Sequence, residues 1–115
     1  VALHTEGDRL MFVNCRFLGN QDTIYTGTEG ARLLFTNCYI EGTTDFIFGP
    51  STALFEYCEL HSKRDSYITA ASTPQSEEFG YVLNIANCIA NAIHILPRLL
   101  LRRRWSLVMF SRTVS

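Results

Sequence analysis

The 115 residues predict an all-β solenoid, a parallel β-helix built from stacked coils. Each of the four cysteines closes a similar tetrapeptide: FVNC at Cys15, FTNC at Cys38, FEYC at Cys58 and IANC at Cys88, with spacings of 23, 20 and 30 residues. Repeats of about 20 to 25 residues, with short β-prone runs between Gly, Asn and Thr, are typical of solenoids. The Leu-x-x-Leu-x-Leu frame of leucine-rich repeats is absent, which favours the β-helix.

Aspartates share this repeat. Seven residues beyond the first three cysteines lie Asp22, Asp45 and Asp65, whereas the same count from Cys88 reaches Ile95 and the register is lost. Equivalent residues of successive coils stack at the ordinary inter-strand spacing of about 4.8 Å. Asp22 and Asp45 are therefore predicted to be neighbours on one face.

Turn residues divide the chain into the expected elements. The first part is predicted to contain a strand, a turn at 6–8, a strand through 10–13, a turn at 19–20 and a loop over 26–30. A strand-turn unit over 32–41, a third strand over 51–60 and a basic turn over 61–64 follow. The last part is predicted to contain a β-rich segment over 66–71, a surface loop over 72–79 and the start of a fourth coil over 81–89.

Composition indicates one globular domain, with 47% hydrophobic and 18% charged residues. No apolar run is long enough to span a bilayer, and nothing at the start resembles a signal peptide. All eleven acids precede residue 79, whereas residues 91–115 hold five arginines and no acid. We therefore expect a fragment, with a partial catalytic domain over 1–90 and a divergent tail over 91–115 that is frameshifted or mis-called. Five arginines among leucines are weak evidence for nucleic-acid binding, and none is expected.

The cysteines are predicted to form a buried ladder of small side chains. Parallel Cβ vectors on adjacent rungs make a disulfide awkward, and the spacing matches no zinc template. His4, His61 and His94 are scattered and receive no role.

The octet GTTDFIFG at 42–49 places one carboxylate, Asp45, in an apolar β-prone run, which is costly unless the charge is paired. The alternative is an outward-facing residue of an ordinary strand. Two stacked carboxylates, one ionised and one protonated, suit a nucleophile and a general acid acting on an acyl or an anomeric carbon. Gln21 offers a neutral amide donor for an oxyanion. Tyr25 and Phe48 occupy equivalent stations, where they stack on sugar rings or pack in the core.

Three stretches resemble the pectinesterase (pectin methylesterase) family: GNQDTIY at 19–25, GTTDFIFG at 42–49 and YITA at 67–70. The resemblance covers about residues 1–82. It implies a right-handed parallel β-helix that removes methyl esters from polygalacturonan and releases methanol without a metal or organic cofactor. It also implies a secreted monomer whose partner is pectin, with no membrane or nucleic-acid partner.

By the same resemblance, Asp45 is the nucleophile. Asp22 is the general acid and then the base, and Gln21 stabilises the oxyanion. Tyr25, Phe48 and Ala70 line the sugar-binding groove. Asp65 has no counterpart role and is expected to be dispensable.

Two family features have no match in this sequence: a second glutamine upstream of Val1, and a Leu-Gly-Arg-Pro-Trp motif after the fourth coil. No role is carried onto Arg98, Arg104 or Trp105. Residues 1–115 alone are therefore expected to be inactive and marginally folded. Two alternatives stay open: a β-helix glycoside hydrolase acting on polygalacturonate, and a non-catalytic pectin-binding remnant.

Overall fold

The computed structural model describes residues 1–64, 69–74, 76, 79–84, 88–90 and 105–106. Within these ranges the chain forms short β-strands and no helix, and so none that could cross a membrane. Asp65, Ile95 and most of the 91–115 tail, on which the sequence analysis made predictions, lie outside the described residues.

The strands form three parallel sheets. Sheet A contains β1 (Leu3–Thr5), β4 (Ile24–Thr26), β7 (Ile47–Gly49) and β10 (Thr69–Ala71). Sheet B contains β2 (Leu10–Val13), β5 (Arg32–Thr36), β8 (Thr52–Glu56), β11 (Tyr81–Leu83) and β13 (Trp105–Ser106). Sheet C contains β3 (Arg16–Phe17), β6 (Tyr39–Gly42), β9 (Glu59–Ser62) and β12 (Ile89–Ala90).

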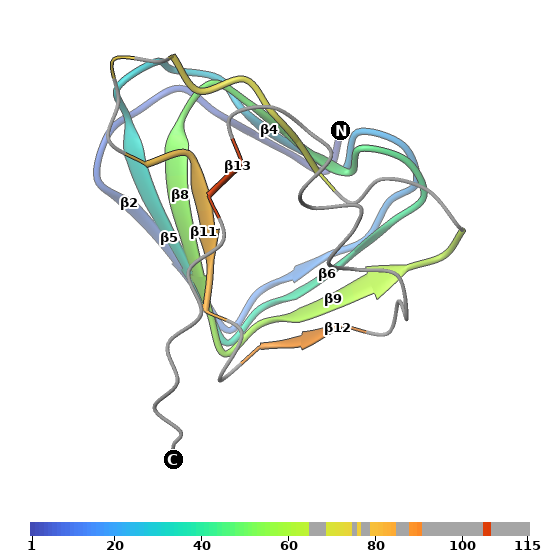
Figure 1. Ribbon diagram of the computed structural model, residues 1–115. Helices are drawn as coiled ribbons and strands as arrows, with labels where there is room; N and C mark the ends of the chain where they lie inside the picture. The colour runs from blue at the N-terminus through green and yellow to red at the C-terminus, as the bar shows by residue number, and fades with distance from the viewer. Residues whose placement is uncertain (65–68, 75, 77–78, 85–87, 91–104, 107–115) are drawn as a thin grey trace.

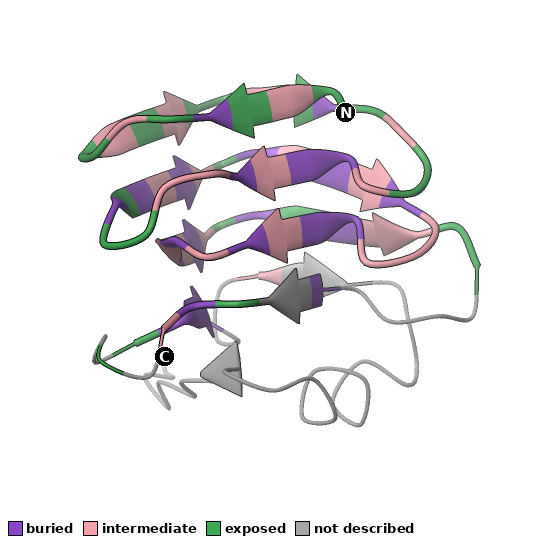
Figure 2. Cartoon of the chain, turned by 90° about the horizontal axis from the view of Figure 1, so that it is seen from above, coloured by how far each residue is buried: buried purple, intermediate pink, exposed green. Residues whose placement is uncertain are grey.

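Consecutive strands enter different sheets, and each strand pairs in parallel with its equivalent in the next coil. Figure 1 shows the three sheets as three walls around a common interior, and Figure 2 shows the coils stacked on one another. The predicted parallel β-helix is confirmed. Trp105 and Ser106, in the predicted divergent tail, pair with Tyr81 and Val82 and add β13 to sheet B.

The interior is a stack of equivalent side chains, because side chains alternate between the two faces of a strand. Phe12, Phe35 and Phe55 lie in register on sheet B, with ring centroids 4.9 and 5.0 Å apart. In the next coil Leu83 stands in register with Phe55, and Tyr81, which pairs with Ala53, makes an edge contact with the Phe55 ring. Phe35 is fully buried, so the phenylalanine row is the centre of the core.

The predicted cysteine ladder is present, with Cys38 and Cys58 buried and Cys15 and Cys88 half-buried rather than buried. None of the four cysteines forms a disulfide, and each of the last three donates to the carbonyl of a phenylalanine in the preceding coil. The three Sγ···O distances are 3.3 Å for Cys38 to Phe12, 3.3 Å for Cys58 to Phe35 and 3.2 Å for Cys88 to Phe55. The repeated tetrapeptide is thus one structural unit, in which the cysteine of one coil binds the phenylalanine of the coil before it.

The residue before each of the first three cysteines turns the chain from sheet B into sheet C. Asn14, Asn37 and Tyr57 have φ angles of 59°, 55° and 53°, in the left-handed region that Asn tolerates better than most residues. The Asn37 side-chain amide donates to Oδ1 of Asn14. We call these three residues the amide corner. The prediction of a single strand over 51–60 is wrong, because the bend at Tyr57 divides this stretch into β8 and β9.

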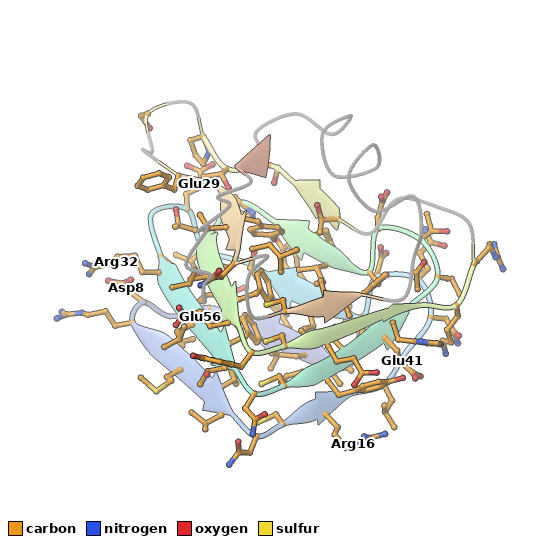
Figure 3. All side chains as sticks on the ribbon, turned by 60° about the horizontal axis from the view of Figure 1, so that its bottom comes forward. Asp8, Arg16, Glu29, Arg32, Glu41 and Glu56 are labelled. Carbon is orange, nitrogen blue, oxygen red and sulfur yellow. The ribbon has the colours of Figure 1, made fainter. Side chains whose placement is uncertain are left out.

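An ion pair joins the first two coils on the outside of the molecule (Figure 3). Arg32 donates from its backbone N to Asp8 Oδ1 at 2.7 Å and from its guanidinium to Oδ2 at 2.8 Å. These bonds from Arg32 hold the pKa of the Asp8 carboxyl well below its usual range. The start of β5 is therefore fixed against the loop before β2.

Candidate active site

Asp22 and Asp45 occupy the second bend of each coil, where the chain passes from sheet C into sheet A. Both have positive φ angles, 57° and 45°, and both are half-buried. The register of β4 with β7 pairs Ile24 with Ile47, so the two aspartates stand at equivalent stations of neighbouring coils. We call this pair the carboxylate corner. The predicted juxtaposition is present, but Asp45 lies on the bend before β7 rather than inside a strand.

Backbone hydrogen bonds hold the two bends together. Asp22 N donates to Thr44 O at 3.4 Å, and Thr43 N donates to Asn20 O at 3.0 Å. The buried Thr23 hydroxyl, next to Asp22, lies 2.8 Å from Glu41 O and 3.1 Å from Asn20 O. The carboxylates therefore project from a bend whose backbone is fixed on both coils.

Gly42 is required at this bend. A Cβ added at Gly42 would lie 2.0 Å from Cβ of Phe46, the fully buried residue that follows Asp45. Such a contact leaves no room for any side chain. The glycine lets Phe46 fill the interior, while Oδ1 of Asp45 is itself buried. One carboxylate oxygen is thus shielded from water, where hydrogen bonds and charges act more strongly than in solvent.

A row of rings lies three residues beyond the aspartates on the outer face of sheet A. Tyr25 and Phe48 stack with centroids 4.8 Å apart and an interplanar angle of 25°. Both are half-buried, so they are neither core residues nor freely exposed. Ala70 pairs with Phe48 in the backbone register and occupies the equivalent position of the next coil. This arrangement suits an extended ligand with apolar ring faces.

His4 is a member of this row that the sequence analysis missed. Its ring lies 4.7 Å from that of Tyr25, and His4 pairs with Tyr25 in the register of β1 with β4. Its Nε2 lies 2.6 Å from Glu6 Oε2. The signal was present in the tripeptides Leu-His-Thr and Ile-Tyr-Thr, which repeat the same pattern of apolar, ring and threonine residues.

A buried hydrogen-bond group supports the row from inside. The hydroxyls of Tyr81 and Thr26 lie 2.7 Å apart, and Tyr81 also donates to Gly49 O at 3.2 Å. Gly49 has a φ of 130°, and a Cβ there would lie 2.1 Å from Thr26 O. Glycine is therefore the residue that allows β4 and β7 to approach each other directly behind Tyr25 and Phe48.

The remaining predicted site residue, Gln21, is exposed and immediately precedes Asp22. The structure thus brings five of the predicted residues to one corner and one wall of the helix: Gln21, Asp22, Tyr25, Asp45 and Phe48. In the described part of the chain, no group of three or more His, Cys, Asp or Glu residues is placed to hold a metal ion.

Comparison with known proteins identifies the family. A family model described as Pectinesterase matches residues 1–115. The chain belongs to the pectinesterase family. It is 51% identical over 83 residues to Pectinesterase 31 of Arabidopsis thaliana, an alignment covering 71% of this chain and 26% of that protein. It is 40% identical over 93 residues to a pectinesterase of Ralstonia nicotianae, covering 71% and 24%.

Solved pectin methylesterases have the same architecture. The pectin methylesterase PemA from Erwinia chrysanthemi has a TM-score of 0.62 and 37% identity, covering 76% of this chain and 28% of that one. The enzyme from Aspergillus niger has a TM-score of 0.66 and 35% identity, covering 80% and 30%. Another solved structure is of a pectin methylesterase in complex with a hexasaccharide, with a TM-score of 0.61. The chain spans about a quarter of the length of the curated relatives it matches.

Proposed function

We propose that this protein hydrolyses the methyl esters of polygalacturonan, forming free carboxylates on the polymer and methanol. The observation that carries the proposal is the pair of stacked carboxylates, Asp22 and Asp45, placed directly before the stacked rings of Tyr25 and Phe48. Family membership supports an ester as the substrate, and the hexasaccharide complex of a structural neighbour supports a saccharide.

In the proposed reaction, an Asp45 oxygen attacks the ester carbonyl carbon, and the carbonyl electron pair moves onto oxygen. The exposed Gln21 amide donates to this oxyanion. When the intermediate collapses, the bond to methoxide breaks and Asp22 gives methoxide its proton. A mixed anhydride with Asp45 remains. Asp22, now ionised, takes a proton from water, which attacks the anhydride and restores both carboxyl groups.

The two carboxylates suit this division of labour because their surroundings differ. Both occupy equivalent bends, and Oδ1 of Asp45 is buried next in sequence to the fully buried Phe46. A nucleophile held away from water is held in one orientation toward its substrate. None of these steps uses a metal or an organic cofactor.

The sugar rings are proposed to lie across the row formed by His4, Tyr25, Phe48 and Ala70. These residues lie in register on one wall, so consecutive coils contact consecutive parts of the polymer. Because pectin lies outside the cell, we propose that the protein acts there, as a monomer.

The test compares two esters in the Asp22→Asn and Asp45→Asn variants, in a preparation of the protein that releases methanol. With the methyl ester, loss of the general acid at Asp22 lowers turnover by about 10²- to 10⁴-fold. With a p-nitrophenyl ester, whose leaving group needs no proton, Asp22→Asn has a much smaller effect on acylation, whereas Asp45→Asn loses both reactions. Equal losses on both esters for Asp22→Asn would contradict its role.

Assays of the same preparation on esterified and unesterified polymer distinguish the proposed esterase from the two alternatives, a glycoside hydrolase and a non-catalytic remnant. A glycoside hydrolase would shorten unesterified polygalacturonate and release no methanol. A non-catalytic remnant would bind pectin and change neither substrate. The expectation that residues 1–115 alone are inactive and marginally folded remains a prediction, and methanol assays with hydrogen-exchange protection of that chain will test it.

A further inference from the structure

A second concave surface lies at the amide corner, around the coil from the carboxylate corner. This cleft has a volume of about 500 Å³ and crosses three consecutive coils above the cysteine ladder. Its lining includes two asparagines, two tyrosines and two charged residues: Asn14, Asn37, Tyr39, Tyr57, Arg16 and Glu59. None of them belongs to the proposed catalytic site, so the cleft needs its own explanation.

Tyr57 is the unusual residue of this corner. It has a φ of 53°, a region where a bulky side chain is uncommon, and it replaces the asparagine that the two preceding coils carry. The amide of Asn37 donates to that of Asn14 in the two preceding coils, and the third coil has a phenol in place of the amide. The side chain is also 60% exposed. Residues held in sparsely populated backbone conformations cluster at ligand-binding sites, and here that conformation presents an exposed aromatic ring.

The neighbouring groups indicate which ligand. Arg16, on the outer face of sheet C (Figure 3), has its guanidinium 4.6 Å from the centre of the Tyr39 ring. Glu59 stands at the equivalent station on the other side of Tyr39. The stack therefore runs from a cation through an aromatic ring to a carboxylate. Such a row orients a ligand that has an anionic group at one end and hydroxyl groups at the other.

We propose that this cleft is an accessory binding site for an acidic saccharide, a uronate segment whose ester has already been removed. Its apolar ring face packs on Tyr57, its hydroxyls bond the amides of the corner and Glu59, and its carboxylate binds Arg16. The inference rests on the proposed function, since the ligand is the product of that reaction. A product segment held here keeps the polymer on the enzyme while another ester reaches the carboxylate corner.

The experiment measures binding of unesterified galacturonate oligosaccharides by calorimetry and by NMR shifts of the Asn14 and Asn37 side-chain amides. It uses the Asp45→Asn background, so that turnover does not interfere. Tyr57→Asn restores the asparagine of the repeat and should keep or raise the Tm while weakening binding at least 10-fold. Arg16→Gln should weaken binding of the unesterified oligosaccharide more than binding of its methyl ester. Glu29→Gln removes an exposed charge on another loop, and it should leave binding of both oligosaccharides unchanged.

Unaltered binding by a folded Tyr57→Asn protein, or shifts absent from Asn14 and Asn37, would overturn the accessory site. The two proposals fail separately. Loss of methanol release with intact binding at the amide corner would refute only the proposed chemistry, whereas methanol release without that binding would refute only the accessory site.

Discussion

The amide corner and the carboxylate corner are two versions of one backbone device. In both, a residue with positive φ turns the chain from one sheet into the next, and Asn or Asp tolerates that conformation. The difference lies in what the stacked side chains do to each other. An amide both donates and accepts, so Asn37 and Asn14 stabilise their stack. A carboxylate that carries no proton only accepts, so Asp22 and Asp45 cannot join in the way that the two amides do.

This contrast teaches that a left-handed Asn or Asp in a repeat is not by itself a sign of catalysis. The deciding features are the charge of the stack and what lies beside it. The carboxylate corner leads directly into the rings of Tyr25 and Phe48, whereas each step of the amide corner leads into a cysteine of the buried ladder.

Both corners depend on the same interior, and the largest loss of stability is expected there. Phe35→Ala removes the middle of the phenylalanine row and should lower the free energy of unfolding by about 3–5 kcal/mol. Urea titration will measure it. Leu34→Ala, at the adjacent half-buried position facing outward, is the control and should lose less. Equal losses would mean that the row is not the centre of the core.

A smaller loss of stability is expected when the amide pair of the amide corner is changed toward the carboxylates of the other corner. Asn37→Asp removes the donor of the amide pair and places an acceptor against Asn14 Oδ1, which should cost about 1 kcal/mol near neutral pH. Asn14→Asp is the matched control, because it keeps an acceptor facing the Asn37 amide and should be neutral or stabilising. If both variants lost the same stability in urea, the directional amide pair would be wrong.

The smallest effect concerns pH. Burial raises the pKa of the Cys38 thiol and of the Tyr81 phenol. The unfolded chain releases these protons first, so stability is complete below about pH 9 and falls as pH rises further. Urea titrations at pH 7 and pH 10 should show the fall, and Cys38→Ala should reduce it. An unchanged midpoint would contradict the buried state of these groups.

The repeat was readable from the sequence because a β-helix coil places equivalent residues at nearly constant spacing. Cys15, Cys38 and Cys58 gave the register, and that register correctly stacked Asp22 on Asp45 and Tyr25 on Phe48. The positions of the catalytic candidates thus followed from counting. Their chemical roles did not, since those came from the resemblance of the surrounding motifs.

Other features were not predicted, because they depend on contacts that the spacing of residues along the sequence does not reveal. The bend at Tyr57 was missed because tyrosine gives no sign of a left-handed conformation. The hydroxyl contact of Tyr81 with Thr26 joins residues 55 positions apart and depends on how the fourth coil meets the second. His4 was missed because it precedes the first cysteine, where the repeat had no marker.

The central claim is that the carboxylate corner is a nucleophile with its acid, and one measurement tests it most directly. Methanol release from methyl-esterified polygalacturonan should be compared for Asp45→Asn and Asp65→Asn, the latter being the third aspartate in the sequence register. Circular dichroism will confirm that both variants are folded. We predict that Asp45→Asn releases no methanol above background and that Asp65→Asn keeps near-normal turnover. Near-normal turnover by a folded Asp45→Asn protein would contradict the assigned mechanism.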